Sequence, residues 1–175
     1  MSRKLNLALL VVPLLFGCWL SWKDEGPLPK QEGRPPEIVK FQAAEVIRPG
    51  ETWRVYLKLR DEDCDMEYVI THLWQPGVSA YPVSFTPIKQ NVCPEMVGYI
   101  FLGTPADRGL IWNQYEAKIV VRDRRGNYSK SITLPLNFDL IPRKNLPEEW
   151  QGQPAVSIGA ITIDLENTLR SETGG

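Results

Sequence analysis

Apolar and polar residues alternate along much of this chain, which is the pattern of half-buried β-strands. The clearest run covers residues 53–60. Its apolar face consists of Trp53, Val55, Leu57 and Leu59. The same period of two returns over residues 115–122 and 132–138. The polar sequence 123–127 between these runs has the residues of a tight turn, so the pattern predicts an antiparallel hairpin.

Four weaker strands are predicted at residues 38–41, 66–74, 81–88 and 98–103. The strand at 66–74 is ambiguous because both of its faces carry apolar side chains. One face holds Tyr68, Ile70, His72 and Trp74, and the other holds Val69, Thr71 and Leu73. The 15 prolines and 13 glycines disfavour long helices. The seven strands therefore predict an all-β domain in which two antiparallel sheets pack face to face.

Two local motifs resemble the immunoglobulin-like and fibronectin-type-III-like domains of bacterial surface proteins. Tyr115 opens the penultimate strand with Ala117 two residues later, and the turn Asp123–Asn127 is followed by Ser129. The resemblance covers roughly residues 35–138 and implies a seven-stranded antiparallel sandwich. It also implies a tyrosine corner, in which the phenol of Tyr115 bonds to upstream backbone. Because Ala117 stands where antibody domains have a cysteine, the antibody-type disulfide is not expected.

The N-terminal segment has the features of a secretory signal, since two basic residues precede an apolar stretch that starts at Leu5. The stretch ends in Leu15–Cys18, which resembles the lipobox of bacterial lipoproteins. The resemblance implies cleavage before Cys18, a lipid on Cys18 and attachment to a membrane of the cell envelope. Trp19 stands where an aspartate would imply inner-membrane retention, so the outer membrane is preferred. The alternative is an uncleaved anchor over residues 5–22.

The remaining cysteines, Cys64 and Cys93, are predicted to form a disulfide. Two cysteines in an oxidising compartment indicate one bond. In the predicted strand order both fall in loops at the same end of the sandwich, which favours the pairing. The alternative is two unpaired thiols.

A last β-prone segment follows a linker rich in proline and polar residues. Its apolar residues are Val156, Ile158, Ile161, Ile163 and Leu165. The segment is an extra strand on this domain's own sheet, a strand that pairs with another chain, or a loosely held tail. We expect it to serve partner binding or edge protection more than core folding, with Val156, Ile158, Ile161 and Ile163 as candidate partner-binding residues.

The composition excludes several functions. A net charge of −1 provides no broad basic surface for nucleic acid. His72 is the only histidine, and no Ser–His–acid set, P-loop or dinucleotide motif occurs in the sequence. We therefore expect a protein that is not an enzyme and has no cofactor, with catalysis as a remote alternative.

Calcium is the one metal for which the sequence offers candidate ligands. The candidate ligands are oxygen-bearing side chains in two loops predicted at the same end: Asp61, Asp63, Asp65, Asp123 and Asn127. Their spacing does not match an EF-hand, and Arg124 and Arg125 are close enough in sequence to neutralise the acids. The favoured interpretation is a solvated cluster of ion pairs.

The sequence thus predicts a lipid-anchored, non-enzymatic protein of the cell envelope whose sandwich domain binds another protein. The alternative is a module that binds carbohydrate or calcium. The expected organisation is a signal peptide at 1–17, a lipid anchor and tether at 18–36, a sandwich at 37–140 and a C-terminal extension at 141–175.

Overall fold

The computed structural model describes residues 33–77, 79–90, 93–141, 150 and 156–165. The signal segment, Cys18 and most of the tether lie outside these ranges. The described part contains ten strands and one short 3-10 helix, with the following bounds: β1 Glu37–Ala43, β2 Val46–Ile47, β3 Thr52–Arg60, β4 Met66–Gln75, β5 Ser79–Ala80, β6 Ser84–Pro87, β7 Glu95–Gly103, η1 Arg108–Trp112, β8 Gln114–Asp123, β9 Ile132–Phe138 and β10 Val156–Ala160. Within these ranges no helix is long and apolar enough to cross a membrane.

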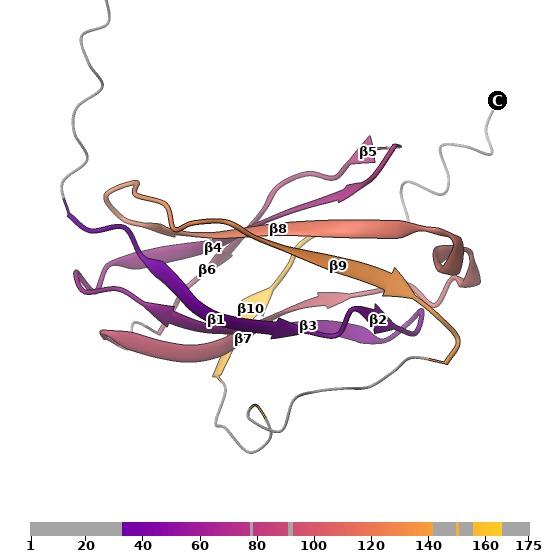
Figure 1. Cartoon of the computed structure of the whole chain (residues 1–175), viewed down its shortest axis with the longest axis horizontal. Coiled ribbons are helices and arrows are strands. Elements are labelled where there is room, and N and C mark those ends of the chain that lie inside the picture. Colours follow the sequence, from indigo (N-terminus) through magenta and orange to yellow (C-terminus); the bar gives the residue numbers. More distant parts are fainter. Residues whose placement is uncertain (1–32, 78, 91–92, 142–149, 151–155, 166–175) are drawn as a thin grey trace, which may run out of the picture. The chain divides into compact units, whose positions relative to one another are not determined.

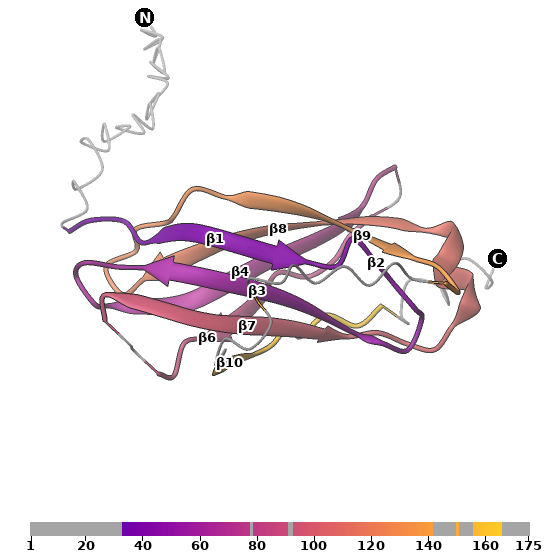
Figure 2. The ribbon, with the colours of Figure 1, turned by 60° about the horizontal axis from the view of Figure 1, so that its bottom comes forward.

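The strands form two sheets that pack face to face (Figure 1). Sheet A has the order β1-β3-β7-β10, and sheet B has the order β2-β9-β8-β4-β5 with β6 also paired to β4. Figure 2 shows β1, β3 and β7 of sheet A side by side. The grouping of β1-β3-β7 in one sheet and β9-β8-β4 in the other follows the immunoglobulin-like arrangement. The predicted two-sheet, all-β fold is confirmed.

The core lies between the sheets and is built from the inward face of each strand. The apolar face predicted for β3 is completely buried, with Trp53, Val55, Leu57 and Leu59 each at 0% exposure. The ambiguity of β4 is also resolved. Its inward residues are Val69, Thr71 and Leu73, which lie opposite Val121, Ile119 and Ala117 of β8.

The strand count and the strand directions differ from the prediction. All seven predicted strands are present, but β2, β5 and β10 are additional. Strands β2 and β5 have two residues each, which is too short for an alternating pattern to be visible in a sequence. Two pairings are parallel rather than antiparallel, β2 with β9 and β10 with β7.

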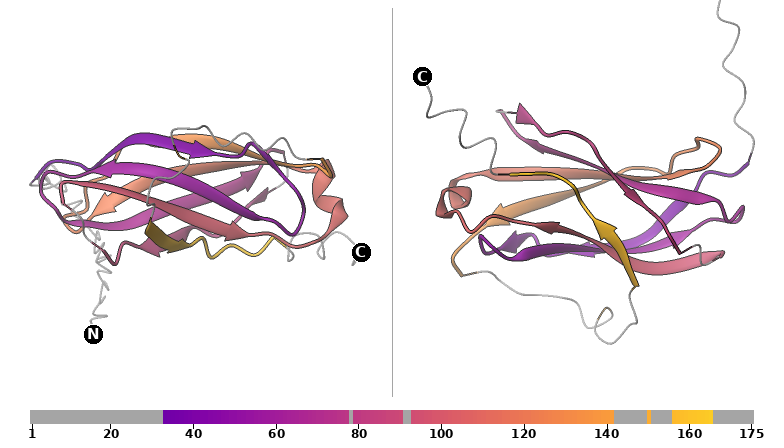
Figure 3. Two further views of the ribbon diagram at one scale, coloured as in Figure 1. Left: turned by 90° about the horizontal axis from the view of Figure 1, so that it is seen from below. Right: turned by 180° about the vertical axis from the view of Figure 1, so that it is seen from behind.

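The C-terminal segment belongs to the domain, so the expected boundary at residue 140 is wrong. Strand β10 extends sheet A, and the residues after it run toward the layer of sheet B (Figure 3, right). The side chains that join the common core are Ile158, Ile161, Ile163 and Leu165. Of the three interpretations of this segment, the structure shows the extra strand on the domain's own sheet.

The predicted disulfide is confirmed, because Cys64 and Cys93 are bonded with their Cα atoms 5.3 Å apart. The bond joins the β3–β4 loop to the β6–β7 loop and closes a sequence separation of 29 residues. A cross-link of this span stabilises a folded domain by about 3–4 kcal/mol in the chain-entropy model.

Candidate interaction surfaces

The outer face of sheet B carries a row of large side chains along β4. We call Tyr68, Ile70, His72 and Trp74, together with Phe85 of β6, the aromatic row. These residues point away from the core because their neighbours Val69, Thr71 and Leu73 point into it. The register places Ile70 beside Phe85 of β6 and Val120 of β8, so the row is continuous across three strands.

The rings of the aromatic row pack on one another. The ring centroids of Tyr68 and Phe85 are 6.0 Å apart in an edge-to-face arrangement, and those of His72 and Trp74 are 5.8 Å apart. The Arg122 guanidinium lies 6.0 Å from the Tyr68 centroid and also pairs with Glu67 at 3.3 Å. Phe85 remains 51% exposed, so the row presents apolar surface to solvent.

Lys118 carries a positive charge beside the middle of the aromatic row, and Glu116 carries a negative one beside Trp74. Lys118 of β8 is the register partner of His72 and is exposed. Lys118 has no ion pair with another described residue. His72 itself is partly buried on the outer face of the sheet.

The outer face of sheet A is also aromatic, but a tryptophan of this chain covers part of it. Tyr56 and Tyr99 have centroids 5.7 Å apart, and Trp150 stacks at 5.8 Å from Tyr56. Trp150 is only 7% exposed, with the Lys40 ammonium 5.9 Å from its ring. The described residues contain no comparable cover on the aromatic row of sheet B.

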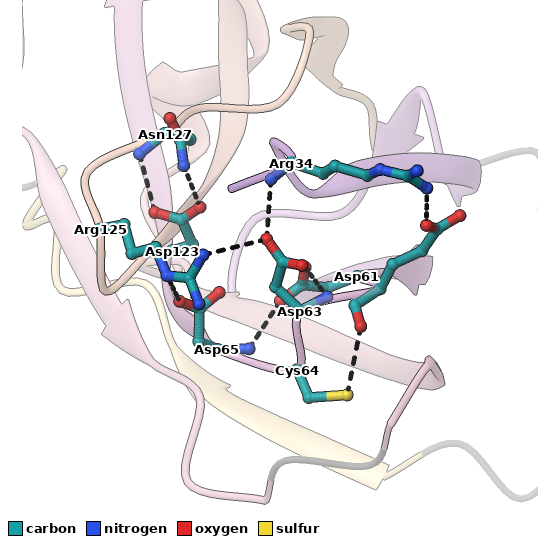
Figure 4. Close-up of polar contacts among 9 residues, drawn as sticks. Arg34, Asp61, Asp63, Cys64, Asp65, Asp123, Arg125 and Asn127 are labelled. Atoms are coloured by element: carbon teal, nitrogen blue, oxygen red, sulfur yellow. Dashed lines mark hydrogen bonds and ion pairs between the residues drawn. The ribbon is translucent and has the colours of Figure 1, made fainter. Parts of the chain in front are cut away.

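The five candidate calcium ligands do gather at one end of the sandwich, as Figure 4 shows. Most of their oxygens already have partners within the protein. Asp123 accepts hydrogen bonds from the backbone and side-chain nitrogens of Asn127, each at 2.7 Å. Asp61 accepts from the backbone N–H groups of Asp63 at 3.2 Å and Asp65 at 2.8 Å. These bonds fold the two loops.

Two arginines neutralise the remaining acids. Arg125 pairs with Asp63 at 3.4 Å and with Asp65 at 3.2 Å. Arg34 pairs with Glu62, and its backbone N–H donates to Asp63 at 2.7 Å. No three His, Cys, Asp or Glu side chains of the described residues are arranged to share a metal ion. The predicted neutralisation by arginine is present, although Arg34 rather than Arg124 supplies the second cation.

Asp65 is the member of this cluster whose carboxyl has a raised pKa. Burial raises the pKa of its carboxyl above the usual value, and the nearby Asp123 and Asp61 raise that pKa further, while Arg125 opposes them. One carboxylate oxygen of Asp65 is buried without a hydrogen-bond partner among the described residues.

Tyr115 is buried where the last long hairpin begins. It is 1% exposed and packs against Tyr81 and Phe138, with ring centroids 6.1 and 5.8 Å away. Burial raises the pKa of its phenol, a hydrogen bond with Tyr81 raises it further, and one with Asn113 lowers it. The bond to upstream backbone that defines a tyrosine corner stays a prediction.

Three of the four candidate partner-binding residues in the C-terminal segment are buried, and the fourth is exposed. Ile158, Ile161 and Ile163 are buried at 7%, 4% and 7% exposure, so they are core residues in this structure. Val156 is 38% exposed at the start of β10. The sequence analysis missed two polar residues that hold this segment, Ser84 and Thr86. Their inward positions in an alternating strand were the available signal.

Comparison with solved structures finds distant likenesses. No protein family and no curated protein matches the sequence. A Niemann–Pick type C2 protein from the Japanese carpenter ant aligns at a TM-score of 0.40 and 11% identity, over 62% of this chain and 96% of that one. The SrpA adhesin R347E mutant from Streptococcus sanguinis aligns at 0.37 and 19% identity, over 62% of this chain and 59% of that one. The PKD domain of an M14-like peptidase from Thermoplasmatales archaeon SCGC AB-540-F20 aligns at 0.35 and 14% identity, over 64% of this chain and all of that one.

Likenesses at TM-scores this low assign neither a family nor a function. The strand order and the buried core define the class, which is an immunoglobulin-like β-sandwich with an additional C-terminal strand.

Proposed function

We propose that this chain is a non-enzymatic, lipid-anchored protein of the cell envelope, and that it binds another envelope protein through the aromatic row of sheet B. The observation that carries the proposal is the row of large apolar and aromatic side chains on that face, where Phe85 is 51% exposed and Tyr68, His72 and Trp74 are partly exposed. An antiparallel sheet with one face on the core normally presents polar residues on the other face. Here β4 presents the partly exposed Tyr68, His72 and Trp74 instead, with Ile70 nearly buried between them at 9% exposure.

The chemistry of the row suits a protein interface. Aromatic residues and arginine are enriched at the centres of such interfaces, and a contiguous exposed apolar patch marks an interaction site. The row combines Tyr68, Trp74 and Phe85 with Arg122 at one end. Lys118 in the middle favours a partner that carries a carboxylate within an apolar face.

The location in the envelope rests on the sequence. The signal-like segment ends in Leu15–Cys18, and residues 18–36 would connect a lipid on Cys18 to the folded domain. A fully extended chain spans at most about 3.3–3.6 Å per residue, so this tether allows the domain to stand off the membrane by up to about 60 Å.

Photocrosslinking from intact cells tests the interface. A photoreactive residue at His72 should yield one defined cross-linked protein, and Trp74→Ala should reduce that product about tenfold or more, as for a central aromatic residue. The matched control is the same residue at Thr52, which is exposed on the outer face of sheet A. Equal products from both positions, or no product at His72 in a folded protein, would reject the proposed interface.

The aromatic row also makes carbohydrate binding the second candidate, because sugars stack on exposed rings. Binding to a glycan array that disappears in Trp74→Ala, without a protein cross-link at His72, would establish this alternative instead.

A further inference from the structure

The end of the sandwich that holds the disulfide also carries a group of basic side chains on the outer side of sheet B. We call this group, together with one tyrosine, the basic patch, which consists of Lys89, Arg122, Arg124, Tyr128 and Lys130. All of them except Arg122 are exposed, with Tyr128 at 53%. Lys89, Arg124 and Lys130 have no ion pair with another described residue.

Backbone pairing brings the basic patch together from segments far apart in the sequence. The residue before Lys89 donates its backbone N–H to the carbonyl of Glu67 at 2.8 Å, which places Lys89 beside the start of β4. Arg122 near the end of β8 has Tyr68 of β4 as its register partner on one side and Tyr128 as its bridge partner on the other. The patch therefore crosses the end of sheet B from the β6–β7 loop to the β8–β9 connection.

The side chains of the β8–β9 connection point outward because the residues between them point inward. Asp123 is 0% exposed, and the exposed Arg124 follows it directly. Ser129 is 7% exposed and lies between the exposed Tyr128 and Lys130. The connection thus presents two cations and an aromatic ring to solvent.

The acids at this end do not cancel the charge of the basic patch, because they are held by other partners. Asp61 and Asp123 are only 2% and 0% exposed and accept hydrogen bonds within their own loops. Arg34 and Arg125, which lie outside the patch, pair with the other acids of the β3–β4 loop (Figure 4). Glu67 is the one carboxylate paired with a member of the patch, at 3.3 Å from Arg122. Four cations therefore face one carboxylate.

The chain enters the sandwich next to the basic patch. A Cβ atom added at Gly33 would lie 2.5 Å from the guanidinium of Arg125, which belongs to the β8–β9 connection. Figure 1 shows the start of the described chain and this connection at the same end of the sandwich. Residues 18–32, which number 15, separate the proposed lipid site from this point and span at most about 50 Å. A membrane that anchors the chain is therefore within reach of the patch.

From these observations we propose that the basic patch binds the anionic headgroups of the membrane that anchors the chain. Lysine and arginine are attracted to anionic lipids at a membrane surface, and an exposed tyrosine is suited to the headgroup level. A lipid surface is the partner because the anchored segment enters at this end. The location rests on the anchor of the proposed function, whereas the attraction is a property of the folded domain. Contact at this end leaves Trp74, at the opposite end of β4, away from the membrane.

Energy transfer in reconstituted vesicles tests the contact in the full chain. A fluorescent amino acid in place of Ser131, which is exposed beside the patch, reports its distance from acceptor-labelled headgroups. The matched position is Gln114, which is exposed at the other end of β8. Transfer from position 131 should be higher in vesicles that contain phosphatidylglycerol than in vesicles of phosphatidylcholine alone, and high salt should remove the difference. Position 114 should show no such rise.

Two charge variants separate the patch from the overall charge. Arg124→Gln with Lys130→Gln should abolish the rise at position 131. The control, Arg54→Gln with Arg108→Gln, removes the same charge from exposed positions outside the patch and should keep the rise. Equal transfer in the two kinds of vesicle, or an equal rise in the two variants, would overturn the proposal.

A failure of the anchor gives a different result from a failure of the basic patch. A chain that does not stay with phosphatidylcholine vesicles argues against the anchor alone. Its sedimentation with phosphatidylglycerol vesicles then decides the patch, and Arg124→Gln with Lys130→Gln should weaken that binding by about tenfold or more. Binding to dextran sulfate, an anionic polysaccharide, without binding to these vesicles would reject the lipid surface as the partner.

Discussion

At the scale of single residues, the buried Asp123, Asn127 and Ser129 are held by structural partners. Asp123 binds Asn127, and Ser129 accepts the backbone N–H of Val121 at 2.9 Å, so the motif that resembles bacterial sandwich repeats forms a self-contained turn. Gly126 allows the turn because its φ is +87°. Local hydrogen bonds and ion pairs with Arg125 therefore engage most of the oxygens that suggested calcium in the sequence.

Asp65→Asn tests the balance of forces in this cluster. The folded-state pKa of Asp65 is raised, so the folded protein binds a proton more readily than the unfolded chain does. Wild-type stability should fall as the pH rises from the ordinary pKa of 3.8 through the folded value, and this loss should be absent in Asp65→Asn. Urea unfolding of both proteins at pH 4 and pH 7 measures the difference.

Two other results with Asp65→Asn would contradict this interpretation of the cluster. If the variant loses stability relative to the wild type as pH rises, attraction to Arg125 outweighs burial. If calcium raises the wild-type melting temperature and Asp65→Asn removes that rise, the loop end is a cation site.

Tyr115→Phe tests the buried phenol. The ring contacts with Tyr81 and Phe138 would be kept and the hydrogen bonds lost, so unfolding free energy should fall by about 1 kcal/mol. Chemical denaturation gives the value, and Tyr128→Phe is the control because Tyr128 is 53% exposed. An unchanged midpoint would show that the phenol contributes nothing to stability.

At the scale of elements, the long strands were predictable and the position of the C-terminal segment was not. Strands such as β3 follow directly from their period of two, since Trp53 and its alternate neighbours need burial. The apolar pattern of the last segment shifts at Ala160, where β10 ends and the chain turns toward sheet B. The outward face of β4 was equally invisible, because Tyr68 and Trp74 are as apolar as the residues that face the core.

A chain that ends at Leu140 should fail to fold. It lacks Ile158, Ile161, Ile163 and Leu165, all buried at 7% exposure or less. Their burial contributes about 6–12 kcal/mol before other costs, which is comparable with the whole stability of a domain. Near-UV circular dichroism checks this, with a chain that ends at Leu165 as the folded control. A cooperative, wild-type melting transition in the shorter chain would restore the boundary at residue 140.

At the scale of the whole molecule, the chain enters the sandwich at the end that carries the disulfide. Arg34 contacts Glu62 and Asp63 in the loop that holds Cys64. The tether is thus joined to the end of the domain that carries the disulfide, while the aromatic row lies on the outer face of sheet B.

Cys18→Ser is the prediction on which the cellular role depends. The variant should lose lipid and appear as uncleaved precursor or as protein released from membranes, because the modified thiol is the only covalent link that the lipobox resemblance implies. Metabolic labelling with a fatty acid and membrane fractionation measure the two effects. The matched control is Cys64→Ser with Cys93→Ser, which removes the disulfide of the domain and should leave labelling unchanged.

Mass spectrometry of the wild-type protein then distinguishes a lipid anchor on Cys18 from an uncleaved membrane anchor over residues 5–22. A lipid-modified Cys18 at the N-terminus supports the anchored module, whereas an intact Met1 in the membrane fraction would mean that residues 5–22 themselves hold the protein in the bilayer.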